Sequence, residues 1–171
     1  QRFNSDFNAI DFLKTPEPLI QKNFSRIMSL KDATKKMSKS DPSDLSRINL
    51  TDKKDQIINK IKKAKTDNET LPNDDKDLKQ RPEVENLLGI YSSLNNQSLK
   101  DTINDFSGKN FSTFKEKLAE LVAEKIFPIS LEINKLMKNN DYIDSVLKKG
   151  GEKANEIATR KVQEIKKIIG F

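Results

Sequence analysis

The spacing of apolar residues after about residue 50 restricts the fold more than any other feature of the sequence. Apolar side chains recur every three or four positions over long stretches, which is the period of one face of an α-helix. Only 5 Gly and 6 Pro occur in 171 residues, fewer than a strand-rich sandwich with many turns would need. An amphipathic helix is marginal by itself in water, so several of them must pack together. The sequence therefore predicts a mainly α protein built as a helical bundle.

Several of the predicted helices have a recognisable start or stop. The helical pattern covers residues 52–65, 83–94, 99–106, 113–137, 141–149 and 152–169. Ser98 can cap the third helix by accepting a backbone N–H. Thr113 and Glu116 have the spacing of a capping box, which would open the fourth helix. Gly150 is expected to end the fifth helix and Gly170 the sixth, because glycine commonly follows the last helical turn.

The first helix and the segment after it are rich in charge. Thr51 or Asp52 is expected to cap the helix over 52–65. Its lysines, Lys60 among them, are assigned to a solvated face away from the apolar residues. Residues 66–82 combine two prolines with several Asn and Asp residues, which predicts a mobile loop that buries little. The acidic run in this loop lacks the glycine and the bidentate glutamate of a calcium-binding loop.

Residues 36–40, Lys-Met-Ser-Lys-Ser, are the strongest candidate for a functional site. A lysine ammonium is a common phosphate ligand. Serine hydroxyls and nearby backbone N–H groups can complete a phosphate cradle. The alternative is an ordinary solvated loop, because the whole chain is rich in Lys and Ser. These five residues alone support the two interpretations about equally.

The surrounding residues, from Arg26 to Asp41, resemble the second signature of class I aminoacyl-tRNA synthetases, in the form found in tryptophanyl-tRNA synthetases. Ala33 stands where that family usually has proline, a change expected to loosen the entry of the loop. Further segments resemble family motifs in the same order along the chain, and together they cover nearly all of it: Arg2–Asn4, Lys63–Asp67, Glu85–Tyr91 and Lys149–Ala154.

The resemblance implies two domains. Residues 1–45 would be a C-terminal remnant of the class I catalytic domain, of Rossmann type, and would include the phosphate-binding loop. Residues 46–171 would be a helical domain that binds the tRNA anticodon. The chain contains no histidine, so it lacks the His-x-Gly-His signature of the family. We therefore expect it to be the C-terminal part of a longer enzyme, inactive without the upstream half of the active site.

The resemblance also assigns roles within the candidate loop. Lys39 and Lys36 would be catalytic, because they would stabilise the pyrophosphate leaving group as an amino acid is activated by ATP. Mg²⁺ would be bound together with ATP. With no Cys and no His, the chain is not expected to hold a metal of its own. The expected ATP ligands are Ile27, Lys36, Met37, Ser38, Lys39 and Ser40.

As a member of this family, the intact protein would be a tryptophan–tRNA ligase whose partners are tRNA, ATP and tryptophan. It would be a cytoplasmic homodimer, and the present chain alone is expected to be monomeric because the family's dimer contact lies mostly upstream. The formal net charge of +6 fits a nucleic-acid partner, and it equally fits a need for solubility. No apolar run approaches the roughly 18 residues that a membrane span requires.

Two alternatives remain open at this point. Tyrosyl-tRNA synthetases share the fold; the match over Asn86–Tyr91 and the lack of a basic C-terminal appendage favour the tryptophan enzyme. The other alternative is a non-enzymatic basic helical module that binds RNA or protein, with residues 36–40 as a solvated loop.

Overall fold

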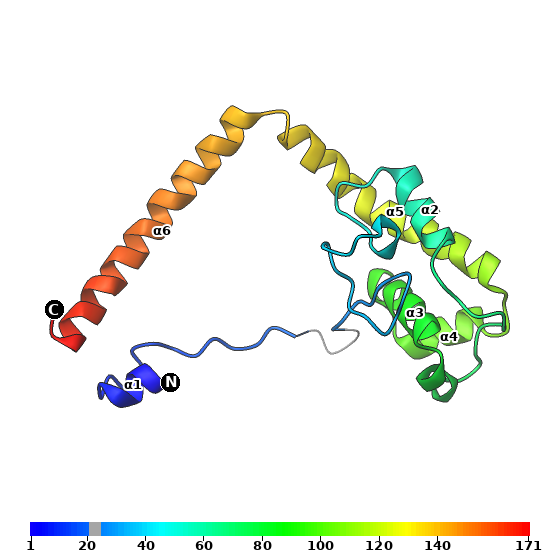
Figure 1. Cartoon of the computed structure of the whole chain (residues 1–171), viewed down its shortest axis with the longest axis horizontal. Helices are drawn as coiled ribbons and strands as arrows, with labels where there is room; N and C mark the ends of the chain where they lie inside the picture. The colour runs from blue at the N-terminus through cyan, green and yellow to red at the C-terminus, as the bar shows by residue number, and fades with distance from the viewer. Residues whose placement is uncertain (21–24) are drawn as a thin grey trace. The chain divides into compact units, whose positions relative to one another are not determined.

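The computed structural model describes residues 1–20 and 25–171, and their regular structure is almost entirely helical, as predicted. Contacts divide the chain into two compact units: Ile20–Lys135, and Gln1–Leu19 together with Leu136–Phe171. This division does not follow residue 45, and the domain boundary there stays a prediction. The elements are α1 Arg2–Asp6, η1 Asp44–Ser46, α2 Lys54–Lys62, η2 Asp75–Gln80, α3 Pro82–Leu94, α4 Leu99–Phe106, α5 Phe111–Leu136 and α6 Asn140–Ile169 (Figure 1).

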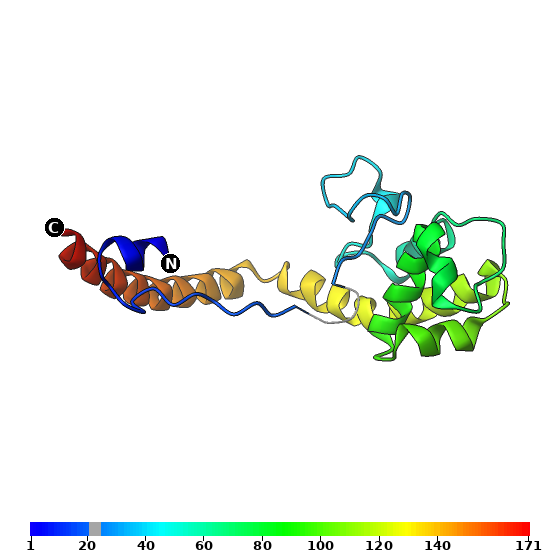
Figure 2. The ribbon, with the colours of Figure 1, turned by 90° about the horizontal axis from the view of Figure 1, so that it is seen from below.

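The larger unit is a small bundle with one hydrophobic core. Helices α2, α3 and α4 gather around the N-terminal half of α5 (Figures 1 and 2). The rings of Phe106 and Phe114 pack edge to face with centroids 4.9 Å apart, and Tyr91 packs on Phe106 at the same distance. Aromatic pairs prefer this geometry because it sets a ring edge against a ring face. The fully or nearly fully buried apolar residues include Ile57, Ile61, Val84, Leu87, Leu88, Ile103, Phe114 and Leu118.

The helix starts of α3 and α4 agree with the sequence signals. Pro82 occupies the first turn of α3, where its missing N–H would have no helical partner in any case. Ser98 caps α4 by accepting the Asp101 N–H at 3.1 Å. The expected capping box of α5 is wrong, because the helix already begins at Phe111. Asn110 provides the cap by accepting the Thr113 N–H at 2.9 Å.

Helix α2 also starts and ends differently from the prediction. Neither Thr51 nor Asp52 caps it; the helix begins at Lys54, and the Asp52 carboxylate accepts the Asn49 N–H at 2.9 Å instead. Beyond its last turn, the carbonyl of Ala64 accepts Lys115 Nζ from α5 at 2.7 Å. Burial lowers the pKa of Lys115, because desolvation disfavours the charged ammonium.

The segment between α2 and α3 packs more closely than predicted. Leu71 and Leu78 are both buried in the core, so the expectation that residues 66–82 bury little is wrong. Arg81 holds the start of this segment by donating to both carboxylate oxygens of Asp67, at 2.8 and 2.7 Å. This ion pair lowers the pKa of Asp67. The two leucines stand alone among polar residues, so they give no periodic signal in the sequence.

The second unit contains a single long helix where two were predicted. Helix α6 continues through Gly150 and Gly151 and ends at Gly170, whose φ of +91° is left-handed. Glycine inside a helix costs roughly 1 kcal/mol relative to alanine, which weakens a helix without breaking it. No side chain of α6 is buried. Lys161 lies 4.1 Å from the ring centroid of Phe12, a cation–π contact within this unit.

Candidate nucleotide-binding loop

The candidate loop is a narrow hairpin whose two legs pair through the backbone. Ser29 N–H donates to the Lys35 carbonyl at 2.8 Å, and Met37 N–H donates to the Ile27 carbonyl at 3.0 Å. Met28 and Lys36 form the antiparallel bridge between these two bonds. Residues 26–30 are therefore one leg of this hairpin, and no named strand occurs in the described ranges 1–20 and 25–171.

The turn that joins the two legs is closed by Asp32. Its carbonyl accepts the Lys35 N–H at 3.0 Å, and its carboxylate accepts the N–H and the hydroxyl of Thr34 at 3.1 and 2.5 Å. The bond from the Thr34 hydroxyl, and then Lys35 at 3.2 Å, lower the pKa of Asp32 to about 2. Ala33 is buried in this turn. The looser loop entry expected from the missing proline stays a prediction.

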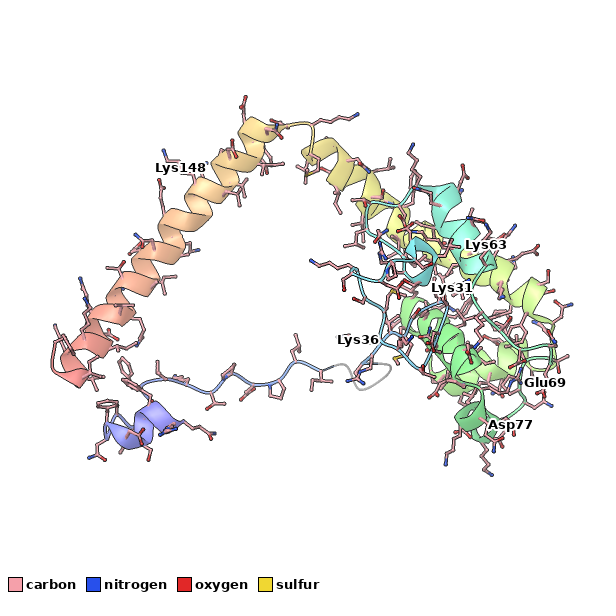
Figure 3. All side chains as sticks on the ribbon, viewed as in Figure 1. Lys31, Lys36, Lys63, Glu69, Asp77 and Lys148 are labelled. Atoms are coloured by element: carbon pink, nitrogen blue, oxygen red, sulfur yellow. The ribbon has the colours of Figure 1, made fainter. Side chains whose placement is uncertain are left out.

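The tip of the loop, residues 38–40, and the lysines beside it are exposed. Ser38 and Ser40 are joined by a 2.9 Å contact between their hydroxyl oxygens. Within the described residues, neither Lys36 nor Lys39 forms an ion pair with a carboxylate. The blue-to-cyan loop extends away from the helices of its unit in Figure 2, and Figure 3 labels Lys36 on it. Two unneutralised cations and two hydroxyls thus face solvent together.

The two apolar residues predicted to contact adenine differ in burial. Met37 is partly buried against the hydrophobic core, whereas Ile27 is 46% exposed. Their backbones are joined by the hydrogen bond described above. Both line an apolar cavity of about 290 Å³ beside the loop. The other residues that line it are Ile48, Leu50, Ile90, Ser93, Leu94, Val122 and Ile126.

After the tip, the chain is fixed by a dense set of polar contacts. The guanidinium of Arg47 donates to the carbonyls of Asp41 and Ser43 at 2.8 and 3.3 Å. The Asp41 carboxylate accepts the Ser43 N–H at 2.8 Å. The carbonyl of Ser46 accepts the N–H of Leu30 at 2.9 Å, which ties this segment to the opposite leg. Residues 41–52 therefore form a well-packed base on the C-terminal side of the tip.

A buried lysine links this base to helix α2. Lys60 is only 2% exposed, and its Nζ lies 2.6 Å from Asp52 and 2.7 Å from Asp44. The expectation that Lys60 lies on a solvated face is wrong. The hydrogen bond from Lys60, followed by that from Asn49, lowers the pKa of Asp44. Position 60 lies between Ile57 and Ile61 on the apolar face, which is the one sign of burial in the sequence.

The N-terminal leg is held by a second buried polar side chain. Asn86 of α3 is 2% exposed; it accepts the Met28 N–H at 2.9 Å and donates to the Met28 carbonyl at 2.9 Å. This contact was not predicted from the sequence. The only hint of this contact in the sequence is the amide side chain of Asn86 itself, which lies between the apolar Val84 and Leu87 on the buried part of α3.

The described residues offer no obvious place for a resident metal. Residues 1–20 and 25–171 contain no group of three His, Cys, Asp or Glu side chains that could hold an ion. In the same ranges, none of the helices combines the length and the apolar character that crossing a bilayer would demand.

Comparison with known proteins finds similarity to class I tRNA synthetases. The profile of the family described as "tRNA synthetases class I (W and Y)" matches residues 1–127. A tryptophan–tRNA ligase of Caulobacter vibrioides is 47% identical over 171 residues, which cover all of this chain and 50% of that protein. A tryptophan–tRNA ligase of Rhizobium meliloti is 52% identical over 155 residues, which cover 91% of this chain and 44% of that protein.

A solved structure supports the fold independently. The tryptophanyl-tRNA synthetase of Mycoplasma pneumoniae superposes with a TM-score of 0.68 at 24% identity, covering 100% of this chain and 50% of that one. The present chain thus spans about half the length of the proteins that it matches.

Proposed function

Because this chain belongs to the class I tRNA synthetases of the tryptophan and tyrosine group, we propose that it supplies the nucleotide-binding loop and the tRNA-binding helices of a tryptophan–tRNA ligase. The relatives named tryptophan–tRNA ligase, at 47% and 52% identity, favour tryptophan over tyrosine as the amino acid. They also favour an enzyme over a non-catalytic RNA-binding module. The intact enzyme would work as a homodimer in the cytoplasm.

The reaction begins with attack of the tryptophan carboxylate on the α-phosphorus of ATP. The new carboxyl–phosphate bond forms tryptophanyl-adenylate, and the bond to the β-phosphate oxygen breaks to release pyrophosphate. A ribose hydroxyl at the tRNA 3′ end then attacks the activated carbonyl, and AMP leaves. Negative charge builds on pyrophosphate in the first step, so cations that bind it more tightly in the transition state accelerate that step.

The observation that carries this proposal is the exposure of Lys36 and Lys39 without an acidic partner among the described residues. Their charge is available to pyrophosphate, with Lys39 as the principal catalytic residue and Lys36 beside it. Ser38 and Ser40 would donate hydrogen bonds to the phosphates. Mg²⁺ would arrive bound to ATP, and we assign it no ligand from this chain.

The base of ATP would lie on the apolar side of the loop. Ile27 and Met37 line the cavity described above, and an adenine ring needs an apolar surface of this kind. The helices of residues 46–171 would bind the tRNA anticodon, with phosphate contacts from some of the exposed lysines.

Steady-state kinetics of ATP–pyrophosphate exchange by the full-length enzyme test this proposal. Lys39→Ala should lower kcat by about 10²–10³-fold, the effect of removing one transition-state donor. Lys31→Ala is the matched control, because Lys31 is an exposed lysine of the same loop that lies before its turn (Figure 3). The control should retain the wild-type kcat. A Lys39→Ala enzyme with unchanged kcat and a raised KM for ATP would contradict the assignment.

A further inference from the structure

One side chain of the helical core binds both backbone polar groups of a residue in the loop. Oδ1 of Asn86 accepts the N–H of Met28, and Nδ2 donates to its carbonyl, each at 2.9 Å. A neighbouring β-strand would pair with the residue in the same way. We propose that Asn86 is a positioning residue that fixes the nucleotide-binding loop for catalysis. This role rests on the function proposed above.

The path from Asn86 to the tip is short and runs through backbone bonds. Met28 lies between Ile27 and Ser29, whose backbones pair with Met37 and Lys35 on the other leg. A displacement of Met28 therefore moves residues 35–37 with it. Ser38 and Lys39 follow directly, so their position relative to bound ATP depends on where Met28 is held.

Asn86 itself is held rigidly. Val84, Leu87 and Leu88, its neighbours on α3, are at most 1% exposed in the core. Close packing of this kind leaves a side chain little room to move. Helix α3 therefore fixes the position of the Asn86 side chain, and the two hydrogen bonds from Asn86 fix the position of the Met28 backbone.

The energetics keep this leg in place when the tip moves. Within the described residues, Met28 is the only hydrogen-bond partner of the Asn86 side chain. Detaching the leg would leave a buried amide unsatisfied, which costs far more than the net gain of an ordinary hydrogen bond. Among the residues that the structure describes, the exposed tip, residues 38–40, forms no comparable hydrogen bond to a helix. A movement of the tip on ATP binding would therefore occur beyond Met37, with the N-terminal leg stationary.

Backbone hydrogen exchange in the full-length protein tests the contact directly. Asn86→Leu keeps a large side chain and Asn86→Ala removes it; both lose the two bonds. Ser92→Ala is the control, because Ser92 is buried on the same helix and donates only to Gly89 within it. Exchange at the amides of Ser29 and Met37 should become about tenfold faster or more in both Asn86 variants and stay unchanged in the control.

Two exchange results would overturn the proposal. Unchanged exchange at Ser29 and Met37 would mean that Asn86 does not hold the leg. Equally accelerated exchange along the whole of α3, in both Asn86 variants, would mean that Asn86 supports the core in general and has no specific effect on the loop.

The kinetic consequence is measured on preparations whose competent active sites have been counted by titration. Both Asn86 variants should lower kcat for adenylate formation by about 10- to 100-fold, the cost of a displacement near 1 Å, and leave KM for tryptophan unchanged. Faster exchange with a wild-type kcat would overturn the positioning role. A wild-type protein that forms no adenylate would instead refute the proposed function, and the exchange data alone would then decide whether Asn86 holds the leg.

Discussion

The tip and the base of the loop place lysines in opposite surroundings. At the tip, Lys39 is exposed and forms no ion pair with a described carboxylate. At the base, Lys60 is 2% exposed and contacts two carboxylates, Asp52 at 2.6 Å and Asp44 at 2.7 Å. A buried ammonium must be paired, because its desolvation otherwise costs several kcal/mol. The charge at the base is neutralised within the protein, whereas the charge at the tip remains available to a ligand.

The largest expected difference concerns stability, and the same substitution tests it at both sites. Lys60→Met leaves Asp52 buried without its cation, so it should lower the free energy of unfolding by about 3–5 kcal/mol. Lys39→Met should change it by less than about 0.5 kcal/mol, as is usual for an exposed side chain. Urea denaturation followed by circular dichroism measures both. Equal losses of unfolding free energy in Lys60→Met and Lys39→Met would contradict the claim that only the lysine at the base is paired and buried.

A second variant separates the destabilisation caused by an unpaired buried charge from the net contribution of the Lys60–Asp52 ion pair to the free energy of unfolding. Replacing both buried partners, in Lys60→Met/Asp52→Leu, removes the ion pair without leaving a buried charge behind. The double variant should recover most of the stability lost in Lys60→Met, because apolar replacements of buried ion pairs are often neutral. The same denaturation experiment measures the recovery. A double variant no more stable than Lys60→Met would show that the ion pair itself stabilises the base.

The smallest expected effect is a shift in the titration of one carboxyl group. Lys60 lowers the pKa of Asp44 below the ordinary 3.8, and Thr34 lowers that of Asp32 to about 2. Because both folded-state values are lowered, each carboxylate stabilises the fold above pH 3.8, and this contribution disappears as the pH falls through the folded-state pKa. In the double variant, NMR titration should move Asp44 back toward 3.8 and leave Asp32 near 2. A parallel shift of both groups would show that Lys60 has no specific influence on Asp44.

The parts of the fold that were predictable from sequence are those with local signals. Pro82 and Ser98 mark the starts of α3 and α4 because each acts on its own helical turn. The exposure of the tip, residues 38–40, likewise agrees with its local composition of lysine and serine. Asn86 and Lys60 were missed because their partners are distant: Met28 lies 58 positions from Asn86, and Asp52 lies 8 positions from Lys60. A polar residue on an apolar face suggests burial but does not identify what pairs with it.

Helix α6 shows a different limit of sequence interpretation. Its apolar residues have the same period as those of α3, yet Ile157 and Val162 are 62% and 48% exposed. Periodicity shows which face of a helix is apolar, whereas burial depends on a second surface that the helix itself does not specify. Gly150 was expected to end the helix because glycine is common after a last turn, but the turns on both sides of it are helical.

The contact between Lys115 and the end of α2 has a consequence for the synthesis of the protein. A helix of 9 residues is too short to persist by itself, and the carbonyl just beyond its last turn accepts a side chain 51 positions further along. The ribosome must therefore add α3, α4 and the start of α5 before the segment just beyond α2 can make this contact. Lys60 lies on α2, whose Ile57 and Ile61 pack in a core with residues of α3, α4 and α5, so the base depends on a helix that is marginal until those later elements are present. A nascent chain that stalls before residue 115 would carry the five-residue signature without the support that orients it.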